Sequence, residues 1–463
     1  MYTIRIFGHY MRLPLLLLVA VEALLFGLAF FVGHRLRWWM IDDVSAFGPV
    51  ALIGYAITVA LVFVLSMAAM GLYEGSAREG FSGVLIRVVV ALALGSAALA
   101  VLAFLFPGLD LWRSILALTV VLAFIAISGL RAALYYAKPG FFRRRVLIFG
   151  ASSLVDEIIR DDSMEVVVVG VIPASDEMPV MIPPELVVRH DRPLLDIAVA
   201  REANEILVAV KDRRGSLPME EFLDCRMSGI YVLEPQSFFE RELGLVKLDL
   251  LTPSWLVHAD GFRQGAITLA IKRLMDVSVA LLFLVLFGPI MVLTAFAIAV
   301  ESRFRDPVFY RQTRIGARGL PFEVLKFRSM CVDAEADGKA RWAIKGDPRI
   351  TGVGAFIRKA RIDELPQILN VLRGEMSFVG PRPERPEFVE ELARKNLFYA
   401  ARSRVKPGVT GWAQLRYAYG SSEEDALRKL EYDLYYVKNH STFLDFLILL
   451  QTVEVVLFGK GAI

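Results

Sequence analysis

The chain has little cysteine and little charge. Its two cysteines, Cys225 and Cys331, lie far apart without the spacing of metal ligands, so neither a disulfide framework nor a zinc site is predicted. Charged residues make up 22% of the 463 residues, and the formal net charge is only +3. Because no dense basic run alternates with aromatic residues, no nucleic-acid partner is expected. Apolar residues are in excess, at 56%, which indicates a membrane protein of several domains.

Four long apolar stretches precede residue 131, and each approaches the ~20 residues that a helix needs to cross a bilayer. The first is too long for a cleaved signal peptide, and buried helices of a soluble protein would not be so many or so long. Basic residues gather on one side, so both ends of the predicted four-helix transmembrane bundle, residues 1–138, face the cytosol. The spans are Leu13–Gly33, Phe47–Met70, Val88–Phe106 and Leu111–Leu130; the cytosolic basic residues include Arg5, Arg12, Arg78, Arg87, Arg131, Lys138 and Arg143, against Arg35, Arg37 and Arg113 on the far side.

Residues 139–253 alternate short β-rich runs with helical segments. This pattern predicts a parallel, doubly wound, Rossmann-like (CoA-binding-like) cytosolic domain. Gly150 ends the first strand, but Ser152, Ser153 and Val155 replace the later glycines of a dinucleotide-binding turn, so a scaffold, regulatory or dimerisation role is favoured over a nicotinamide site. The predicted strands are Arg144–Gly150, Glu165–Ile172, Glu205–Val210 and Gly229–Pro235, and the predicted helices are Leu154–Asp161, Leu194–Ala203 and Pro218–Met227.

A second membrane-type region begins at Lys272 and Arg273, and its apolar part, Val277–Val300, is long enough to span. Both flanks are basic, so neither end favours the far side of the membrane. Pro289 lies near the middle, where proline removes a backbone donor and clashes with the preceding turn. We therefore expect a re-entrant helix over residues 272–303 that breaks at Pro289 and returns to the cytosolic side. The alternative is a kinked fifth span, which would place everything after residue 305 outside the cell.

The adjacent carboxylates of Asp363 and Glu364 stand among basic residues. Asp363 is expected near the cap of a helix whose first turn holds Pro366, where unpaired amides would face the carboxylates. An isolated Asp there would only cap the helix. With cations around them, the two carboxylates predict a site for a polyphosphate anion and Mg²⁺, with one carboxylate acting as nucleophile. The cations are Lys326 and Arg328, which a strand would aim at one face, with Arg358, Arg361 and Arg382.

Five features follow one another from about Lys272 onward: KRLMD, the mid-membrane Pro289, PVFYRQTRIGARGLPFEVLKFRSM, RKARIDELPQILNVLRGEMSFVGPRPERPEF and KPGVTGWAQ. On these features the chain resembles the monotopic polyprenol-phosphate phosphoglycosyltransferases, whose bacterial sugar transferase domain initiates O-antigen, capsule or exopolysaccharide synthesis. Asp306, where glycine is common, and Arg361, where small polar residues are frequent, depart from the family pattern.

The resemblance implies a multi-pass, homodimeric protein of the bacterial inner membrane, with a monotopic catalytic domain at residues 254–463 on the cytoplasmic face. Asp363 would attack the β-phosphate of a UDP-sugar, release UMP and hold the sugar phosphate, and Glu364 would help to bind Mg²⁺. Undecaprenyl phosphate would then accept the sugar phosphate in a ping-pong sequence. The implied substrate contacts are Lys326, Arg328, Arg358, Arg361 and Arg382.

Several alternatives stay open in the sequence. The turn at Gly380–Pro383 presents Arg382 or is a structural loop, and Lys406–Gln414 contacts a nucleotide or the membrane surface or is an ordinary turn. The aromatic stripe over residues 432–446 lies at the membrane interface or in the core. The rival functions are a non-catalytic membrane scaffold or regulator of polysaccharide synthesis, which the motif series disfavours, and nucleotide-sugar oxidation, which the missing glycines disfavour. The sugar itself is not identified.

Overall fold

The computed structural model describes residues 3–6, 9–41, 48–73, 80–109, 112–137, 143–161, 164, 166–173, 182–210, 217–252, 265–335, 347–417, 420 and 422–458. The chain divides into two compact units, one of residues 1–5 and 10–250 and the other of residues 6–9 and 251–463. The domain boundaries predicted at residues 138 and 253, and the predicted cytosolic residues Arg78 and Lys138, lie outside the described residues.

Four apolar helices follow a short N-terminal β-hairpin. Contacts join α1 to α2 and α4, and join α3 to α2 and α4. These four helices and α10 are long and apolar enough to cross a membrane. The four predicted stretches are therefore confirmed as helices, and α1, α3 and α4 each continue at one end through residues outside the apolar run. The bounds are β1 Thr3–Ile6, β2 His9–Arg12, α1 Leu13–Ile41, α2 Pro49–Ala69, α3 Phe81–Leu105 and α4 Arg113–Ala137.

An ion pair lies inside this helical bundle. Nε of Arg131 on α4 donates to Oε1 of Glu22 on α1 at 2.6 Å, and Nη1 of Arg131 donates to the carbonyl of Leu72 at 2.8 Å. The prediction counts Arg131 only as a cytosolic flanking charge, whereas the structure uses it to neutralise a buried carboxylate. A charge among apolar helices requires such a partner.

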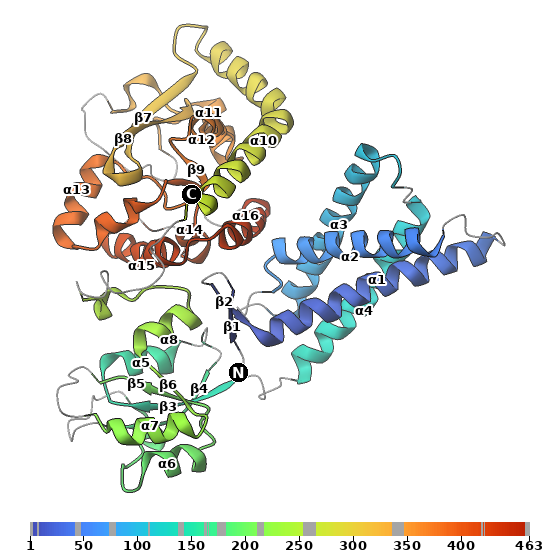
Figure 1. The fold of residues 1–463 in the computed structure, drawn as a ribbon. Coiled ribbons are helices and arrows are strands. Elements are labelled where there is room, and N and C mark those ends of the chain that lie inside the picture. The colour runs from blue at the N-terminus through green and yellow to red at the C-terminus, as the bar shows by residue number, and fades with distance from the viewer. Residues whose placement is uncertain are drawn as a thin grey trace. The chain divides into compact units, whose positions relative to one another are not determined.

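A four-stranded parallel sheet in the order β4-β3-β5-β6 follows the bundle. Figure 1 shows α5 and α8 on one side of this sheet and α6 and α7 on the other. All four predicted strands and all three predicted helices are present, because buried β-branched runs and amphipathic segments are local signals. The bounds are β3 Arg144–Phe149, α5 Ser153–Arg160, β4 Val166–Ile172, η2 Pro184–Leu186, α6 Leu194–Ala200, β5 Glu205–Val208, α7 Met219–Met227, β6 Tyr231–Leu233, α8 Pro235–Glu242 and η3 Leu248–Leu250.

Gly150, at the end of β3, is required by packing. Its φ is +107°, and a Cβ added there would lie 2.7 Å from the carbonyl carbon and oxygen of Ala209. The chain leaving β5 therefore occupies the space beside Gly150 at the carboxyl ends of the two strands, which is where an open parallel sheet usually binds its ligand. Backbone packing thus explains why residue 150 is a glycine, without a bound dinucleotide.

The second unit contains a long helix and two small sheets. Strands β7 and β8 form an antiparallel hairpin, and β9 and β10 pair in parallel. The bounds are α10 Ala266–Glu301, β7 Phe309–Ile315, η4 Ala317–Gly319, β8 Pro321–Phe327, η5 Val332–Glu335, α11 Gly352–Lys359, η6 Ile362–Glu364, α12 Gln367–Arg373, β9 Ser377–Val379, α13 Pro386–Lys395, η7 Tyr399–Arg404, β10 Gly408–Thr410, α14 Trp412–Arg416, α15 Glu423–Asn439 and α16 Thr442–Leu457.

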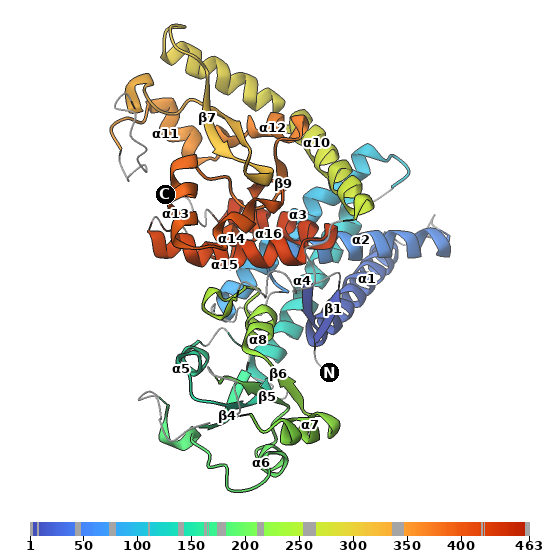
Figure 2. The ribbon, with the colours of Figure 1, turned by 60° about the vertical axis from the view of Figure 1, so that its left-hand side comes forward.

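Helix α10 is continuous from Ala266 to Glu301, with Pro289 inside it. Its ribbon nevertheless changes direction along its length in both views (Figures 1 and 2). A proline inside a helix bends it in this way because one backbone hydrogen bond is missing. The re-entrant course in a membrane stays a prediction.

The first turns of α10 are fixed inside the second unit. Nζ of Lys272 donates to Oδ2 of Asp445 on α16 at 2.7 Å and to the carbonyl of Val379 on β9 at 3.0 Å. The Arg273 guanidinium donates to two carbonyls at the end of α12, each at 2.6 Å. The hydropathy argument treats Lys272 and Arg273 as a free basic flank, but the structure pairs both of them. The KRLMD motif is thus an anchor for the helix.

The C-terminal aromatic stripe is divided between core and surface. Tyr435 and Tyr436 are buried, whereas Phe446 is exposed. In the Lys406–Gln414 segment Trp412 is buried as well, and β10 lies so close to the chain at Gly380 that a Cβ on Gly408 would meet the Gly380 nitrogen at 2.1 Å. Both segments therefore contribute to packing, and a contact of either with a nucleotide or a membrane stays a prediction.

Candidate active site

Asp363 and Glu364 lie in the 3-10 turn η6, and this corrects the prediction of a helix cap. Pro366 is the residue before α12, not part of its first turn, and Asp363 lies three residues earlier. Arg361, directly before the turn, has a left-handed backbone with φ 58° and ψ 17°. This conformation reverses the chain after α11, so the carboxylates are presented by a tight turn between two helices.

An apolar cluster holds this turn in place. Ile298 on α10, Phe327 on β8 and Ile357 on α11 are buried together, and Ile362 and Leu365 of the turn segment pack against them. The residues on either side of the acidic pair thus face a core, while the pair itself is left to face the site. Burial of such side chains contributes about 1.5–3 kcal/mol each.

Helix α11 is capped from two directions. The Oγ1 of Thr351 accepts a hydrogen bond from the Gly354 amide at 2.9 Å, and Oε1 of Glu301, the last residue of α10, accepts one from the Val353 amide at 3.0 Å. These bonds satisfy amide groups that a helix start leaves unpaired. They also fix the end of α10 to the helix that leads into η6, residues Ile362–Glu364, which we call the acidic turn.

Asn370 joins the helix that follows the turn to the strand that carries Lys326. Its Nδ2 donates to the Glu323 carbonyl and to Oε2 of Glu375, each at 2.7 Å, and its Oδ1 accepts from the Leu325 amide at 3.0 Å. The side chain is fully buried. Because these bonds fix α12 against β8, Lys326 is held opposite the acidic turn.

Glu364 is bound by two cations. Nζ of Lys326 donates to Oε1 of Glu364 at 2.8 Å, and Nη2 of Arg382 donates to the same oxygen at 3.1 Å. Burial by itself would raise the pKa of Glu364, but the charges of Lys326 and Arg382 outweigh it and bring the pKa well below its usual range. Glu364 is therefore ionised at any physiological pH.

Asp363 has a different environment. Its carboxylate makes no hydrogen bond or ion pair with any residue that the structure describes. Burial and the neighbouring charge of Glu364 raise its pKa above the ordinary value, although Lys326, Arg358 and Arg361 act in the opposite direction. Of two adjacent carboxylates, one is held by cations and the other has no such contact among the described residues, and a shifted pKa of this kind is common at functional sites.

Arg328 pairs with a different carboxylate. It is buried, and its Nη1 lies 3.3 Å from Oδ2 of Asp306 without hydrogen-bond geometry. The structure thus brings Lys326, Arg358, Arg361 and Arg382 to the acidic pair but pairs Arg328 with Asp306. Asp306 is the departure from the family pattern noted in the sequence, and it has a direct partner here.

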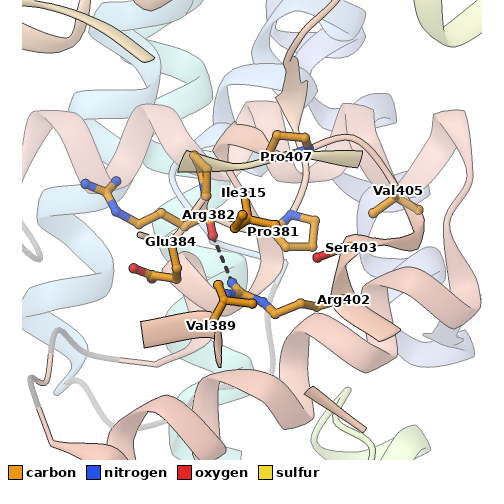
Figure 3. A pocket seen from close by; sticks show the side chains of 11 residues that line it. Ile315, Pro381, Arg382, Glu384, Val389, Arg402, Ser403, Val405 and Pro407 are labelled. Carbon is orange, nitrogen blue, oxygen red and sulfur yellow. Dashed lines mark hydrogen bonds between the residues drawn. The ribbon is translucent and has the colours of Figure 1, made fainter. Parts of the chain in front are cut away.

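Arg382 points toward the acidic pair from the Gly380–Pro383 turn. The turn lines a shallow pocket with residues of β7, α13 and η7, where Arg402 donates to the carbonyl oxygen of Arg382 (Figure 3). The sequence prediction missed Arg402, Asp433, Asn370 and Glu301. No local motif identifies them, because each acts through a partner far away in the chain.

The site fits Mg²⁺ only as an ion shared with a phosphorylated substrate. No group of three or more His, Cys, Asp or Glu side chains that could hold a metal occurs among the described residues. Both donors to Glu364 use Oε1, so neither of them binds Oε2. Mg²⁺ commonly binds one or two carboxylates together with phosphate oxygens and water, and this donor set meets that requirement.

Comparison with known proteins gives one family and several relatives. Residues 267–459 match the bacterial sugar transferase family. A UDP-N-acetylgalactosamine-undecaprenyl-phosphate N-acetylgalactosaminephosphotransferase of Aeromonas hydrophila is 43% identical over 52% of this chain and 56% of its own length. An undecaprenyl-phosphate glucose phosphotransferase of Komagataeibacter xylinus is 40% identical over 41% of this chain and 36% of its own length.

A third relative is matched over more of its length. The UDP-glucose:undecaprenyl-phosphate glucose-1-phosphate transferase of Caulobacter vibrioides is 43% identical over 41% of this chain and 71% of its own length. By contrast, the chain spans about half or less of the first two relatives. The family match over residues 267–459 contains the acidic turn. The relatives differ in the sugar that their names give.

Proposed function

This chain belongs to the bacterial sugar transferase family, and from that premise we propose that it transfers a sugar-1-phosphate from a UDP-sugar to undecaprenyl phosphate, releasing UMP. The observation that carries the proposal is the acidic turn, in which Glu364 is bound by Lys326 and Arg382 while Asp363 has no such partner among the residues that the structure describes. A diphosphate donor needs cations for its charge and a nucleophile for its phosphorus, and this turn supplies both.

In the first half-reaction, an oxygen of Asp363 forms a bond to the β-phosphorus of the donor. The bond between that phosphorus and the oxygen bridging to the α-phosphate breaks, and UMP leaves with the bridging oxygen. The sugar phosphate then remains on Asp363 as an acyl phosphate. The raised pKa of Asp363 makes its ionised form a stronger base than an ordinary aspartate, which favours attack.

In the second half-reaction, a phosphate oxygen of undecaprenyl phosphate attacks the same phosphorus and displaces the Asp363 carboxylate. Arg358 and Arg361, whose charges act on Asp363, would stabilise the phosphate oxygens in both halves. The products are undecaprenyl-diphosphate-sugar and the free enzyme, so the sequence is ping-pong.

Mg²⁺ bound at Glu364 would neutralise charge on the donor's phosphate oxygens and on the departing UMP. Lys326 and Arg382 keep Glu364 ionised and oriented for that role. Arg328, paired with Asp306, would contact substrate only after that pair opens.

The remaining predictions belong to the same proposal. The five apolar helices fit a multi-pass protein of the bacterial inner membrane, with α10 as the re-entrant element and the acidic turn on the cytoplasmic face. The parallel sheet would be the Rossmann-like domain of residues 139–253 and would serve scaffolding, regulation or homodimerisation. The reaction would be the first membrane step of exopolysaccharide, capsule or O-antigen synthesis.

The proposal is tested with purified full-length protein, Mg²⁺, undecaprenyl phosphate and a panel of radiolabelled UDP-sugars that includes glucose, galactose and N-acetylated amino sugars. One donor should transfer its label to lipid and release UMP. With donor alone, mass spectrometry should find a phosphosugar adduct on Asp363. Glu387→Gln is the matched control for substitution of Asp363. It changes an exposed carboxylate on α13 and should retain activity. Absence of transfer with every donor would favour the membrane scaffold.

A further inference from the structure

A buried arginine lies behind the turn that carries Arg382. Arg402 is 8% exposed. Its guanidinium binds Oδ2 of Asp433 on α15 through Nε at 3.0 Å and Nη2 at 2.7 Å, and Nη1 donates to Oη of Tyr399 at 3.0 Å. Nη2 also donates to the carbonyl oxygen of Arg382 at 2.9 Å (Figure 3). Arg402 thus joins α15 to the backbone of the turn.

Three successive carbonyls of this turn are held by separate donors. The Gly408 amide donates to Pro381 at 2.9 Å, Arg402 donates to Arg382 at 2.9 Å, and Nη1 of Arg314 donates to Pro383 at 3.2 Å. Prolines on both sides restrict the backbone further, because each fixes its own φ. Of these three donors only Arg402 acts on the residue whose side chain reaches the acidic pair.

The Arg382 side chain depends on this support. Its guanidinium is 32% exposed and spans 3.1 Å to Glu364. A long, partly exposed side chain loses conformational entropy when it makes an ion pair, so such a pair is weak unless its base is already fixed. Arg402 supplies that fixation with a buried, charge-assisted contact, which is among the stronger kinds of hydrogen bond.

We propose that Arg402, oriented by Asp433, is a positioning residue for sugar-phosphate transfer: it holds the Arg382 backbone so that the Arg382 guanidinium meets Glu364. This inference rests on the proposed function. Arg402 itself need not touch substrate, and its effect on activity passes through Arg382. If Arg402 had only a structural role, its substitution would lower the stability of the fold. Its effect on activity would then be the same with or without the Arg382 side chain.

The kinetic test is a double-mutant cycle in full-length protein, with UMP release and the melting temperature measured together. Arg402→Lys keeps the charge but cannot reach three partners, so kcat/KM should fall by about tenfold or more. In an Arg382→Ala background the same change should alter kcat/KM by less than about twofold. Arg402 acts on activity through the Arg382 side chain, and this background lacks that side chain. Equal losses in both backgrounds would overturn the proposal.

The matched control is Arg349→Lys. Arg349 also combines an acidic partner, Asp347, with a backbone carbonyl, that of Ala334. This variant should keep kcat/KM within about twofold of wild type, as expected of a substitution away from the site. A tenfold loss in the control would mean that weakening any arginine paired with a carboxylate and a backbone carbonyl lowers activity, and would count against a positioning role.

A stability cycle separates this inference from the proposed function, since it needs no activity. The coupling between Arg382→Ala and Glu364→Gln in melting temperature should be present in wild type and lost with Arg402→Lys. If Arg402→Lys does not fold, Asp433→Asn, which keeps an oxygen acceptor, takes its place. Coupling that survives would overturn the positioning role, whereas an inactive wild type with the expected coupling loss would overturn only the proposed function.

Discussion

Lys326 donates to Glu364 at 2.8 Å across the gap between a β-hairpin and the acidic turn, on the same oxygen that Arg382 uses. This contact makes Glu364 unlike Asp363, although the two are neighbours in sequence. The pKa of one is lowered and that of the other is raised. Different environments thus shift the pKa values of two adjacent carboxylates in opposite directions, which supports the different roles that we propose for them.

Replacing Asp363 should separate activity from stability. Asp363→Asn should reduce transfer by more than about 10³-fold, because the nucleophile is lost. The folded-state pKa of Asp363 lies above its unfolded value, so the ionised carboxylate destabilises the fold above the folded pKa, and this penalty vanishes below the unfolded value. The variant should therefore melt higher than wild type at pH 7, with a gain that shrinks as the pH falls. A lower melting temperature at pH 7 would contradict this assignment.

Glu364 should show the opposite behaviour. Its pKa is depressed, so its stabilisation is complete above the unfolded pKa and is lost as the pH falls through the folded pKa. Glu364→Gln should melt lower than wild type at pH 7, because Lys326 and Arg382 lose their anionic partner, and the difference should narrow in acid. Melting curves in a series of buffers measure this. A constant difference at every pH would show that the charge is not responsible.

The Lys272 anchor should be sensitive to removal of one partner. Lys272→Met leaves the buried Asp445 with the Tyr436 hydroxyl as a donor but without its Lys272 cation, which should cost about 3–5 kcal/mol, while Lys272→Met with Asp445→Leu should recover much of the loss. Chemical denaturation of the purified protein measures both. Lys395→Met, which breaks only surface pairs, serves as the control and should leave the unfolding midpoint unchanged. Equal losses in the single and double variants would mean that Lys272 contributes by packing rather than by charge.

The course of α10 is tested by labelling. A cysteine in place of Phe304, which is 71% exposed just after the helix, should react with an impermeant maleimide only from the cytoplasmic side. The background needs Cys331→Ser, because Cys331 is exposed, whereas Cys225 is buried. A cysteine in place of Trp39, at the far end of α1, should react only from outside. Labelling of the residue 304 cysteine from outside would establish a fifth span.

Patterns that depend on neighbouring residues predicted much of the fold. Alternation and apolar runs located all four parallel strands and the apolar helices, since hydrophobic periodicity is encoded locally. The grouping of Lys326 and Arg382 with the acidic pair was also predicted, in that case from the motifs. The 3-10 turn was not, because the left-handed Arg361 that creates it has no glycine or asparagine to mark it.

The tertiary partners of several charged residues could not be predicted from a single sequence. Lys272 reads as a flanking charge until Asp445, 173 residues later, is placed beside it. In the same way Arg402 is one of many arginines until Asp433 and the Arg382 carbonyl surround it. The pairing of Arg328 with Asp306 was likewise not predicted, and a phosphate contact of Arg328 stays a prediction. Burial of a charge is decided by what folds against it, so composition and spacing cannot reveal it.

Packing and a hydrogen bond connect α10 rigidly to the acidic turn. The packing is that of Ile298, Phe327 and Ile357, and the hydrogen bond runs from the Val353 amide to Glu301. If α10 lies in lipid as proposed, the height of the Asp363 carboxylate above the headgroups would follow from the depth of that helix in the bilayer. Lipids with shorter or longer acyl chains would shift that height, since a helix adjusts its tilt and depth to the hydrocarbon around it. Turnover in vesicles should therefore vary with acyl-chain length even when both substrates are saturating.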